Sequence, residues 1–272
     1  MSGLEMVALT DVGVKRNHNE DFVGITPRLG FAIVADGMGG HNAGEVASSM
    51  AVEVITRYFE SELPKQEEGK LDASTGLTGE SMLAQKVIGI ANNAIHKAAE
   101  ENQECSGMGT TVVVAMFYGN RLTAAHVGDS RMYRLRGECL SHVTEDHSLV
   151  QEQVRRGLLT MEDARQSSIK NLVTRALGIE SGVEPDVVED IFQANDVYLI
   201  CSDGLTDVVP DEAIRLTMLD HLKNLHKAAA QLIQLANDAG GPDNISVVLV
   251  RTPKKFHRKT KGFLSRLFWW RA

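Results

Sequence analysis

The sequence predicts an α+β fold in which stacked antiparallel sheets are covered by helices. Two observations carry the prediction: strand-like runs are joined by hairpin-type turns, and longer helix-like segments occur in pairs between them. The composition agrees, because 272 residues with 43% hydrophobic and 24% charged side chains are typical of a globular chain with a sizeable core. We expect one domain with extensions, since α/β chains of about 250 residues often fold as one unit.

The first 101 residues alternate between strand-like and helix-like segments. Residues 6–12 alternate weakly, and residues 22–25 and 31–35 are apolar runs bounded by Gly, Pro and polar residues, as buried strands are. Residues 43–59 and 80–101 carry apolar side chains at helical spacing, which predicts two amphipathic helices. The polar stretch between these helices has no periodicity and predicts a solvated linker.

The remaining chain returns to strands. Residues 110–117, 121–127 and 132–135 are β-rich and separated by glycine-containing turns, which predicts an antiparallel meander. Residues 145–177 are polar and helical in character without a strong apolar stripe, so we expect them to lie over the surface. The last elements are a strand, a third amphipathic helix and a final strand, at residues 197–201, 225–239 and 245–250.

Charge and cysteine content exclude several classes of protein. The last nineteen residues hold seven Lys and Arg and no Asp or Glu, which leaves the body with 21 basic and 36 acidic residues. An acidic body argues against nucleic-acid binding, which requires a basic face. Three widely spaced cysteines support neither a disulfide framework nor a structural zinc site, and they favour the reducing cytoplasm. We expect no secretion signal and no transmembrane helix.

Acidic residues recur where strand-like runs end. Four of them lie next to or near a glycine: Asp36, Asp129, Asp203 and Asp243. Glu20 and Asp21 open the second predicted strand. Carboxylates gathered at strand ends repel one another unless cations neutralise them, and hard oxygen ligands select Mg²⁺ or Mn²⁺ over zinc. One Asp–Gly pair is an ordinary turn, but turns alone do not explain the repeated pattern.

Six motifs in order resemble the type 2C protein serine/threonine phosphatases in their bacterial form, over about residues 5–252. The motifs are RNHNED at 16–21, ADGMGGH at 35–41, GMGTT at 107–111, VGDSR at 127–131, CSDGLTD at 201–207 and GPDN at 241–244. The resemblance implies a four-layer αββα sandwich of two antiparallel sheets flanked by helices. It implies a catalytic domain at residues 1–253 with a flap at 145–177, followed by a basic aromatic tail at 254–272.

The resemblance also implies a centre for two Mn²⁺ or Mg²⁺ ions. Asp36 would bridge the ions, and the other ligands would be the Gly37 carbonyl, Asp203, Asp243 and, directly or through water, Glu20 and Asp21. Asp129 and Asp207 resemble the carboxylates that hold a third, weaker ion together with Asp203. A water between the two core ions would become hydroxide and attack phosphorus in line, so no protein nucleophile is required. Arg16 resembles the phosphate anchor, since a planar guanidinium suits two phosphate oxygens.

The general acid departs from the better-known eukaryotic members, which have His where this chain has Met38. His41 follows three residues later and is a candidate to protonate the leaving oxygen, directly or through water. A histidine in a Gly-rich turn is also often only part of the turn. His126 lies on a predicted strand, so we expect it to be packed rather than to bind an ion.

These observations predict a cytoplasmic, metal-dependent phosphatase that removes phosphate from Ser and Thr of phosphoproteins. We expect it to oppose a cognate protein kinase, to act as a monomer and to bind no nucleic acid. A non-catalytic phosphoprotein-binding regulator of the same fold would be expected to lack a bridging carboxylate or Arg16, and this chain retains them. A small-molecule phosphomonoesterase is the other alternative, and a substrate survey distinguishes it.

The tail interleaves aromatic and basic residues and contains both tryptophans of the chain. Its apolar residues are too few to span a bilayer, but a short helix with basic flanks and terminal Trp residues can lie on an anionic membrane surface. Contact with an acidic partner or with the acidic body fits equally, and an unordered terminus is the alternative. We predict a peripheral tether, at the inner membrane surface or on a partner, that contributes nothing to chemistry.

Overall fold

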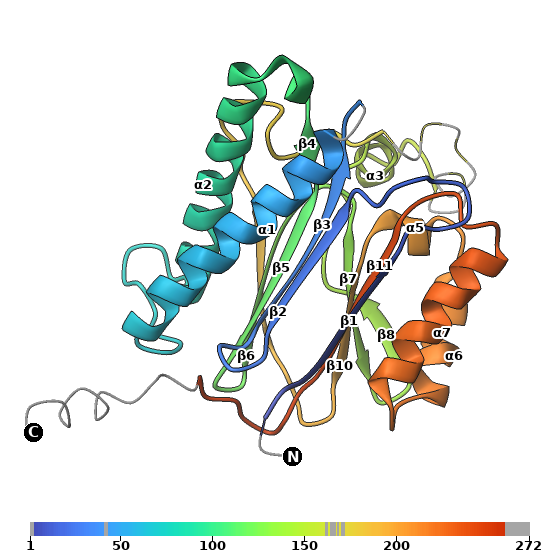
Figure 1. Cartoon of the computed structure of the whole chain (residues 1–272). Coiled ribbons are helices and arrows are strands. Elements are labelled where there is room, and N and C mark those ends of the chain that lie inside the picture. Colours follow the sequence, from blue (N-terminus) through green and yellow to red (C-terminus); the bar gives the residue numbers. More distant parts are fainter. Residues whose placement is uncertain are drawn as a thin grey trace, which may run out of the picture.

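Two antiparallel sheets packed face to face form the centre of the structure, a computed structural model, and helices cover their outer faces (Figure 1). The structure describes residues 3–40, 43–160, 163, 167, 169 and 172–258. The five-stranded sheet has the order β1 (Glu5–Asp11), β11 (Ile245–Arg251), β10 (Val197–Cys201), β7 (Arg131–Arg136) and β8 (Cys139–His142). The other has the order β2 (Asp21–Thr26), β3 (Phe31–Met38), β5 (Val112–Tyr118), β6 (Arg121–Val127) and β9 (Asp186–Ile191), with β4 (Gly109–Thr110) beside β3.

Two helices cover each sheet. The six-stranded sheet carries α1 (Ala43–Glu62) and α2 (Gly79–Glu101), and the five-stranded sheet carries α6 (Asp211–Asp220) and α7 (Leu225–Asp238). Shorter turns of helix are η1 (Leu63–Lys65), η2 (Gln103–Cys105), α3 (Leu149–Arg155) and α5 (Asp203–Thr206). Within the described part of the chain, no helix has the length and apolar character needed to cross a membrane.

Alternation along the strands builds three apolar layers. In β3, Ile33 packs with the helices α1 and α2, whereas Val34 packs between the two sheets. In β11, Val248 packs between the sheets and Leu249 packs toward α6 and α7. Successive strand residues point to opposite faces, so each central sheet contributes to two layers at once. The four-layer αββα sandwich is therefore confirmed.

The predicted meander is wrong at its third strand. β5 and β6 pair in one sheet, but β7 pairs with β10 in the other. The turn between β6 and β7 passes through Gly128, whose φ of +107° suits glycine, and a Cβ there would lie 2.6 Å from the Thr111 side chain. Turn residues specify a local bend and not the sheet that receives the next strand. This turn carries the chain from one sheet to the other.

Several elements are absent from the sequence prediction, among them β8, β9 and α6. In β9 the acidic residues are satisfied by distant parts of the chain, since Glu189 accepts hydrogen bonds from Thr78 and Ser81, and Asp190 pairs with Arg134. A pattern rich in acids does not indicate a half-buried strand unless these partners are known. Tertiary contacts therefore determine that this segment forms a strand.

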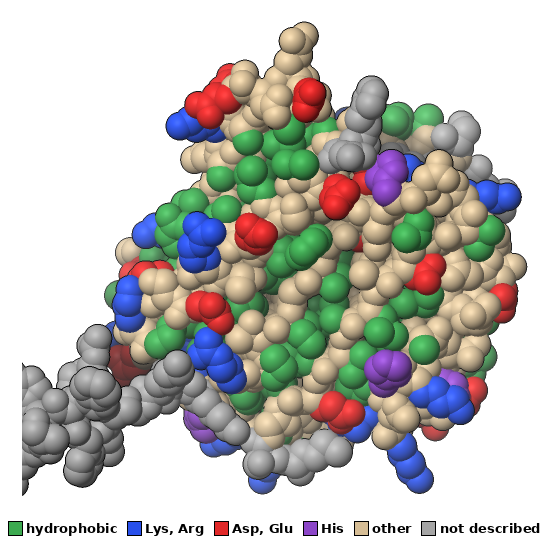
Figure 2. All heavy atoms as spheres, in the orientation of Figure 1, with side chains coloured by type: hydrophobic (Ala, Val, Ile, Leu, Met, Phe, Trp, Pro, Cys, Tyr) green, Lys and Arg blue, Asp and Glu red, His purple; other side chains and the backbone are tan. Residues whose placement is uncertain are grey.

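The edge strands β1 and β2 lie side by side between α1 and α7 (Figure 1). Figure 2 shows hydrophobic side chains gathered on this face between α1 and β1. Phe22 of β2 is 40% exposed and Tyr58 of α1 is 38% exposed. Acidic and basic side chains are interspersed around this apolar strip (Figure 2).

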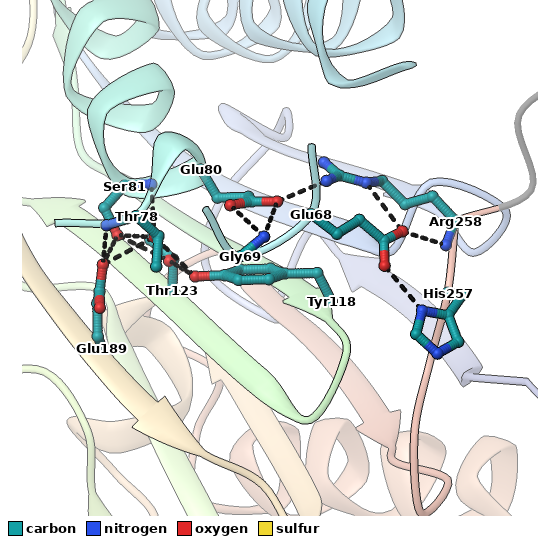
Figure 3. Close-up of polar contacts among 10 residues, drawn as sticks. All are labelled: Glu68, Gly69, Thr78, Glu80, Ser81, Tyr118, Thr123, Glu189, His257 and Arg258. Atoms are coloured by element: carbon teal, nitrogen blue, oxygen red, sulfur yellow. Dashed lines mark hydrogen bonds and ion pairs between the residues drawn. The ribbon is translucent and has the colours of Figure 1, made fainter. Parts of the chain in front are cut away.

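The first residues of the predicted tail pack against the sandwich. The Phe256 N–H donates to the Gly119 carbonyl at 2.7 Å, and its side chain is buried beside Gly30. The Arg258 guanidinium binds Glu80 and Glu68, and it is only 3% exposed (Figure 3). The boundary expected after residue 253 therefore falls within a packed segment that continues to residue 258. Residues 259–272 lie outside the described residues.

Candidate metal centre

The predicted acidic residues meet at one end of the sandwich. β3 and β10 end there, and β2 and β11 begin there (Figure 1). The register of β2 and β3 places Asp21 directly opposite Asp36. Asp203 follows β10 and Asp243 precedes β11, and these two strands are hydrogen-bonded neighbours. Four carboxylates from distant parts of the sequence thus share one end of the fold.

Backbone hydrogen bonds hold the end of β3 in place. The Asp36 carbonyl accepts from the Thr111 N–H at 2.8 Å, and the Asp36 N–H donates to the Thr111 hydroxyl at 3.1 Å. The Gly37 N–H donates to the Glu20 carbonyl at 3.0 Å, and a Cβ on Gly37 would lie 2.1 Å from the Gly44 carbonyl oxygen. Glycine is therefore required at this close approach of strand and helix.

Two polar residues outside the predicted ligand set support the centre. The side-chain oxygen Oδ1 of Asn244 accepts from the Glu20 N–H at 2.8 Å, while its side-chain Nδ2 donates to the Val12 and His18 carbonyls. The Ser202 hydroxyl donates to Asp21 Oδ2 at 2.8 Å. Each residue stands next to a predicted ligand in its motif, Asn244 after Asp243 and Ser202 before Asp203. This adjacency is the sequence signal that could have identified them. Asn244 fixes the loop that carries Arg16 to Asp21, and Ser202 orients one carboxylate.

Crowding raises the pKa of the clustered carboxyl groups. Burial is the largest cause for Asp36 and Asp203, whose pKa values lie well above the usual range, and the next causes are the charges of Asp21 and Asp129 respectively. Burial also raises the pKa of Asp21 and of Asp129 to about 6. Divalent cations reverse such shifts, because a positive charge stabilises the ionised form of each carboxylate.

The residues present fit divalent cations. Among the described residues, Glu20 Oε1 and Asp21 Oδ1 are buried oxygens without a hydrogen-bond partner. His18 Nε2 lies 3.6 Å from Glu20 Oε1, which is beyond hydrogen-bond distance. A buried carboxylate oxygen without a partner is costly, and a cation removes that cost. The side-chain donors are hard oxygens, which suit Mn²⁺ or Mg²⁺ better than zinc.

Arg16 reaches this centre, because its Nη2 lies 2.7 Å from Asp243 Oδ2 and its side chain is 47% exposed. The predicted phosphate anchor thus contacts a predicted ligand while remaining open to solvent. His41, the predicted acid, lies outside the described residues.

A pocket of about 470 Å³ lies beside the centre. Asp129, Asp203 and Asp207 line it together with Glu145 and Gln151 of the predicted flap. The charges of Asp129 and Asp207 are among the causes that raise the pKa of Asp203, so these three carboxylates act on one another. The structure brings them together and places the first part of the flap next to them.

Comparisons with known proteins agree with this arrangement. A family model described as protein phosphatase 2C matches residues 15–246. A serine/threonine phosphatase of Listeria innocua, stp, is 42% identical over 246 residues, which cover 89% of this chain and 93% of that protein. Serine/threonine protein phosphatase PstP of Mycobacterium tuberculosis is 39% identical over 263 residues, which cover 96% of this chain and 48% of PstP.

Solved structures show the same fold. The crystal structure of Mycobacterium tuberculosis PstP/Ppp aligns with a TM-score of 0.81 at 36% identity, covering 92% of this chain and 99% of that one. A PstP catalytic domain in complex with two manganese ions aligns with a TM-score of 0.80 at 36% identity, covering 93% and 100%. Because a family match spans residues 15–246 and these relatives are 36% to 42% identical over most of the chain, the protein belongs to the protein phosphatase 2C family, as its motifs predict.

Proposed function

We propose that this protein is a Mn²⁺- or Mg²⁺-dependent phosphatase that hydrolyses phosphoserine and phosphothreonine in proteins. The observation that carries the proposal is the meeting of Asp21, Asp36, Asp203 and Asp243 at one end of the sandwich. Beside them, the buried oxygens Glu20 Oε1 and Asp21 Oδ1 have no hydrogen-bond partner among the described residues. The related PstP domain binds two manganese ions, which supports the same metals here.

The chain's own residues divide the work of the site. Asp36, the Gly37 carbonyl, Asp203 and Asp243 would hold the two core ions, and Glu20 and Asp21 would contribute directly or through water. When bound, the ions supply an activated water and neutralise charge on the phosphate. Arg16 binds two phosphate oxygens and so orients phosphorus for in-line attack. His41 donates the proton that the leaving Ser or Thr oxygen requires.

A third, weaker ion completes the proposal. Asp129 and Asp207 would hold it together with Asp203, at the pocket that the flap also lines. Because Glu145 and Gln151 of the flap line the same pocket, an ion held by these carboxylates would place positive charge next to the flap.

The decisive experiment measures phosphate release from a phosphothreonine peptide with Mn²⁺ and after thorough chelation. We expect activity with Mn²⁺ and none with chelator, and we expect Asp36→Asn to abolish turnover in a folded protein. Asp238→Asn, at the end of α7, is the matched control and should behave as wild type. Activity that survives chelation would contradict metal dependence. Binding of the peptide without turnover would indicate a regulator, and preference for phosphorylated metabolites would indicate a small-molecule esterase.

We also propose a cellular setting: a monomer in the cytoplasm that opposes a cognate protein kinase. The thiols of Cys105, Cys139 and Cys201 are free, as expected in a reducing compartment. Mass measurement in solution tests the monomer, and accumulation of phosphothreonine proteins after deletion of the gene tests the opposition to a kinase.

The tail is proposed as a tether to an anionic membrane surface. β11 begins beside Asp243 and runs to Arg251, so the packed segment that follows leaves from the opposite end of the sandwich, roughly 20 Å from the metal centre at about 3.3 Å per residue. A tether attached there leaves the active site facing away from the surface. In a co-sedimentation assay with anionic vesicles at low salt, the full chain should sediment with the vesicles, whereas a version that ends at Arg258 should stay in the supernatant. Equal behaviour of the two would contradict a membrane tether.

A further inference from the structure

The turn that carries Asp129 is held by the first residues of the flap, 145–147, which are called the root of the flap. The His147 N–H donates to the Gly128 carbonyl at 2.9 Å, and the Gly128 N–H donates back to His147 Nδ1 at 3.2 Å. One residue therefore satisfies both backbone groups of the glycine that precedes Asp129. The His147 side chain is 3% exposed, so water does not replace these contacts.

Neighbouring contacts hold the other side of the same turn. Asp146 receives a bidentate pair from Arg131, with Nε to Oδ1 at 2.9 Å and Nη2 to Oδ2 at 2.6 Å. The Thr111 and Ser130 hydroxyls are hydrogen-bonded at 2.7 Å. Asp129 thus lies between two residues that are each held by hydrogen bonds.

His126, His147 and Asp186 also have the spacing of a metal site, since one nitrogen or oxygen of each lies within 4.8 Å of the others. The hydrogen bond from Gly128 to Nδ1 argues against this, because the neutral ring then carries its proton on Nε2. That atom faces Asp186 Oδ2 at 3.3 Å, and the other Asp186 oxygen binds the Arg175 guanidinium at 2.8 Å. His147 Nε2 therefore offers no lone pair to an ion, and one Asp186 oxygen is already paired with a cation.

The surroundings keep His147 in this neutral form. Burial, followed by the proximity of His126 and Arg175, lowers the pKa of His147 to about 4. The rings of His126 and His147 stack with centroids 4.6 Å apart, and His126 Nε2 contacts the Glu145 carbonyl of the flap at 2.7 Å. Among the described residues, the charged and titratable groups that face the ring from other parts of the chain are His126 of β6, Asp186 of β9 and Arg175. The acceptor at Nδ1 is therefore preserved at neutral pH.

We propose that His147 is a positioning residue for the third metal ion: it holds the Gly128–Asp129 peptide so that the Asp129 carboxylate faces Asp203 and Asp207. The inference rests on the proposed third ion site. The root of the flap then influences the affinity for the third ion, although His147 contacts neither an ion nor the substrate.

The test counts Mn²⁺ ions bound to the full chain by equilibrium dialysis and gives their dissociation constants. For wild type we expect two tight ions and one weaker ion. His147→Leu should weaken the third ion about tenfold, the effect of one lost buried hydrogen bond, and should leave the two tight ions unchanged. His147→Asn, whose amide oxygen takes the place of Nδ1, should restore third-ion binding, whereas His147→Gln should not.

The outcomes separate this inference from the site on which it rests. Asp129→Asn should remove the third ion, and if it does not, the proposed third site is wrong. If Asp129→Asn removes the ion but His147→Leu leaves its affinity unchanged, His147 is not a positioning residue. Equal weakening of all three ions would also overturn the inference, because it would indicate a general loss of structure. If the His147→Leu variant does not fold, the comparison uses His147→Asn and His147→Gln. Equal third-ion affinity in these two variants would also show that His147 is not a positioning residue.

Discussion

Removing the Arg258 side chain should destabilise the whole domain, although residue 258 lies beyond the last strand. Glu80 is fully buried, and its carboxylate is held by the Arg258 guanidinium and by the Gly69 N–H at 3.2 Å (Figure 3). Arg258→Ala leaves that carboxylate buried without its cation. Loss of one partner of a buried ion pair costs about 3–5 kcal/mol.

This cost predicts a large thermal shift. One kcal/mol moves Tm by roughly 2–4 °C in a domain of about this size, so Arg258→Ala should lower Tm by roughly 6–20 °C. A chain that ends at residue 253 should lose at least as much, because it also lacks the buried Phe256 ring. A chain that ends at Arg258 should keep the Tm of the full protein.

Thermal and urea unfolding of these variants, followed by circular dichroism, measures the effect. Lys254→Ala is the control, since Lys254 is exposed and belongs to the same segment. The double variant Glu80→Gln with Arg258→Met should recover much of the loss, because it removes the uncompensated charge. The reasoning is refuted if the free energy of unfolding of Arg258→Ala stays within about 1 kcal/mol of wild type, because removing one partner of a buried ion pair is expected to cost more than that.

Three further predictions concern the metal centre. Without metal, the stability contributed by Asp21 and Asp129 should be lost as pH rises from about 4 to about 6, because their folded-state pKa values lie above the unfolded value. Added Mn²⁺ should remove this loss, and the free energy of unfolding at pH 4.5 and pH 7, with and without chelator, measures it. Equal stability at the two pH values in the presence of chelator would contradict the prediction. Arg16→Ala should mainly raise KM for a phosphopeptide, since its phosphate contact exists in both ground and transition states; an unchanged KM would show that Arg16 is not the anchor. His41→Ala should lower kcat more for a phosphoserine peptide than for an activated aryl phosphate, whose leaving group needs no proton; equal losses would exclude His41 as the acid.

Much of the centre was readable from the sequence because its chemistry is local. Asp36-Gly37 and Asp203-Gly204 each follow an apolar run and Asp243 shortly precedes one, so strand period and turn residues identify them without knowledge of the fold. The buried strands and the long helices followed for the same reason, since one face of each must be apolar. Their order then identified the family, and the fold it implies is the one observed.

Tertiary structure decided what depends on partners far apart in the chain. Only the packed fold shows that β7 leaves the predicted meander for the other sheet, which brings the Asp129 turn between the two sheets. Only the fold pairs Arg258 with Glu80, across 178 positions of sequence, and converts the first residues of a basic tail into part of the core. The physical reason is common to both cases: a charged or turn residue has a local preference that favours solvent, and it is overridden where burial supplies a complementary group.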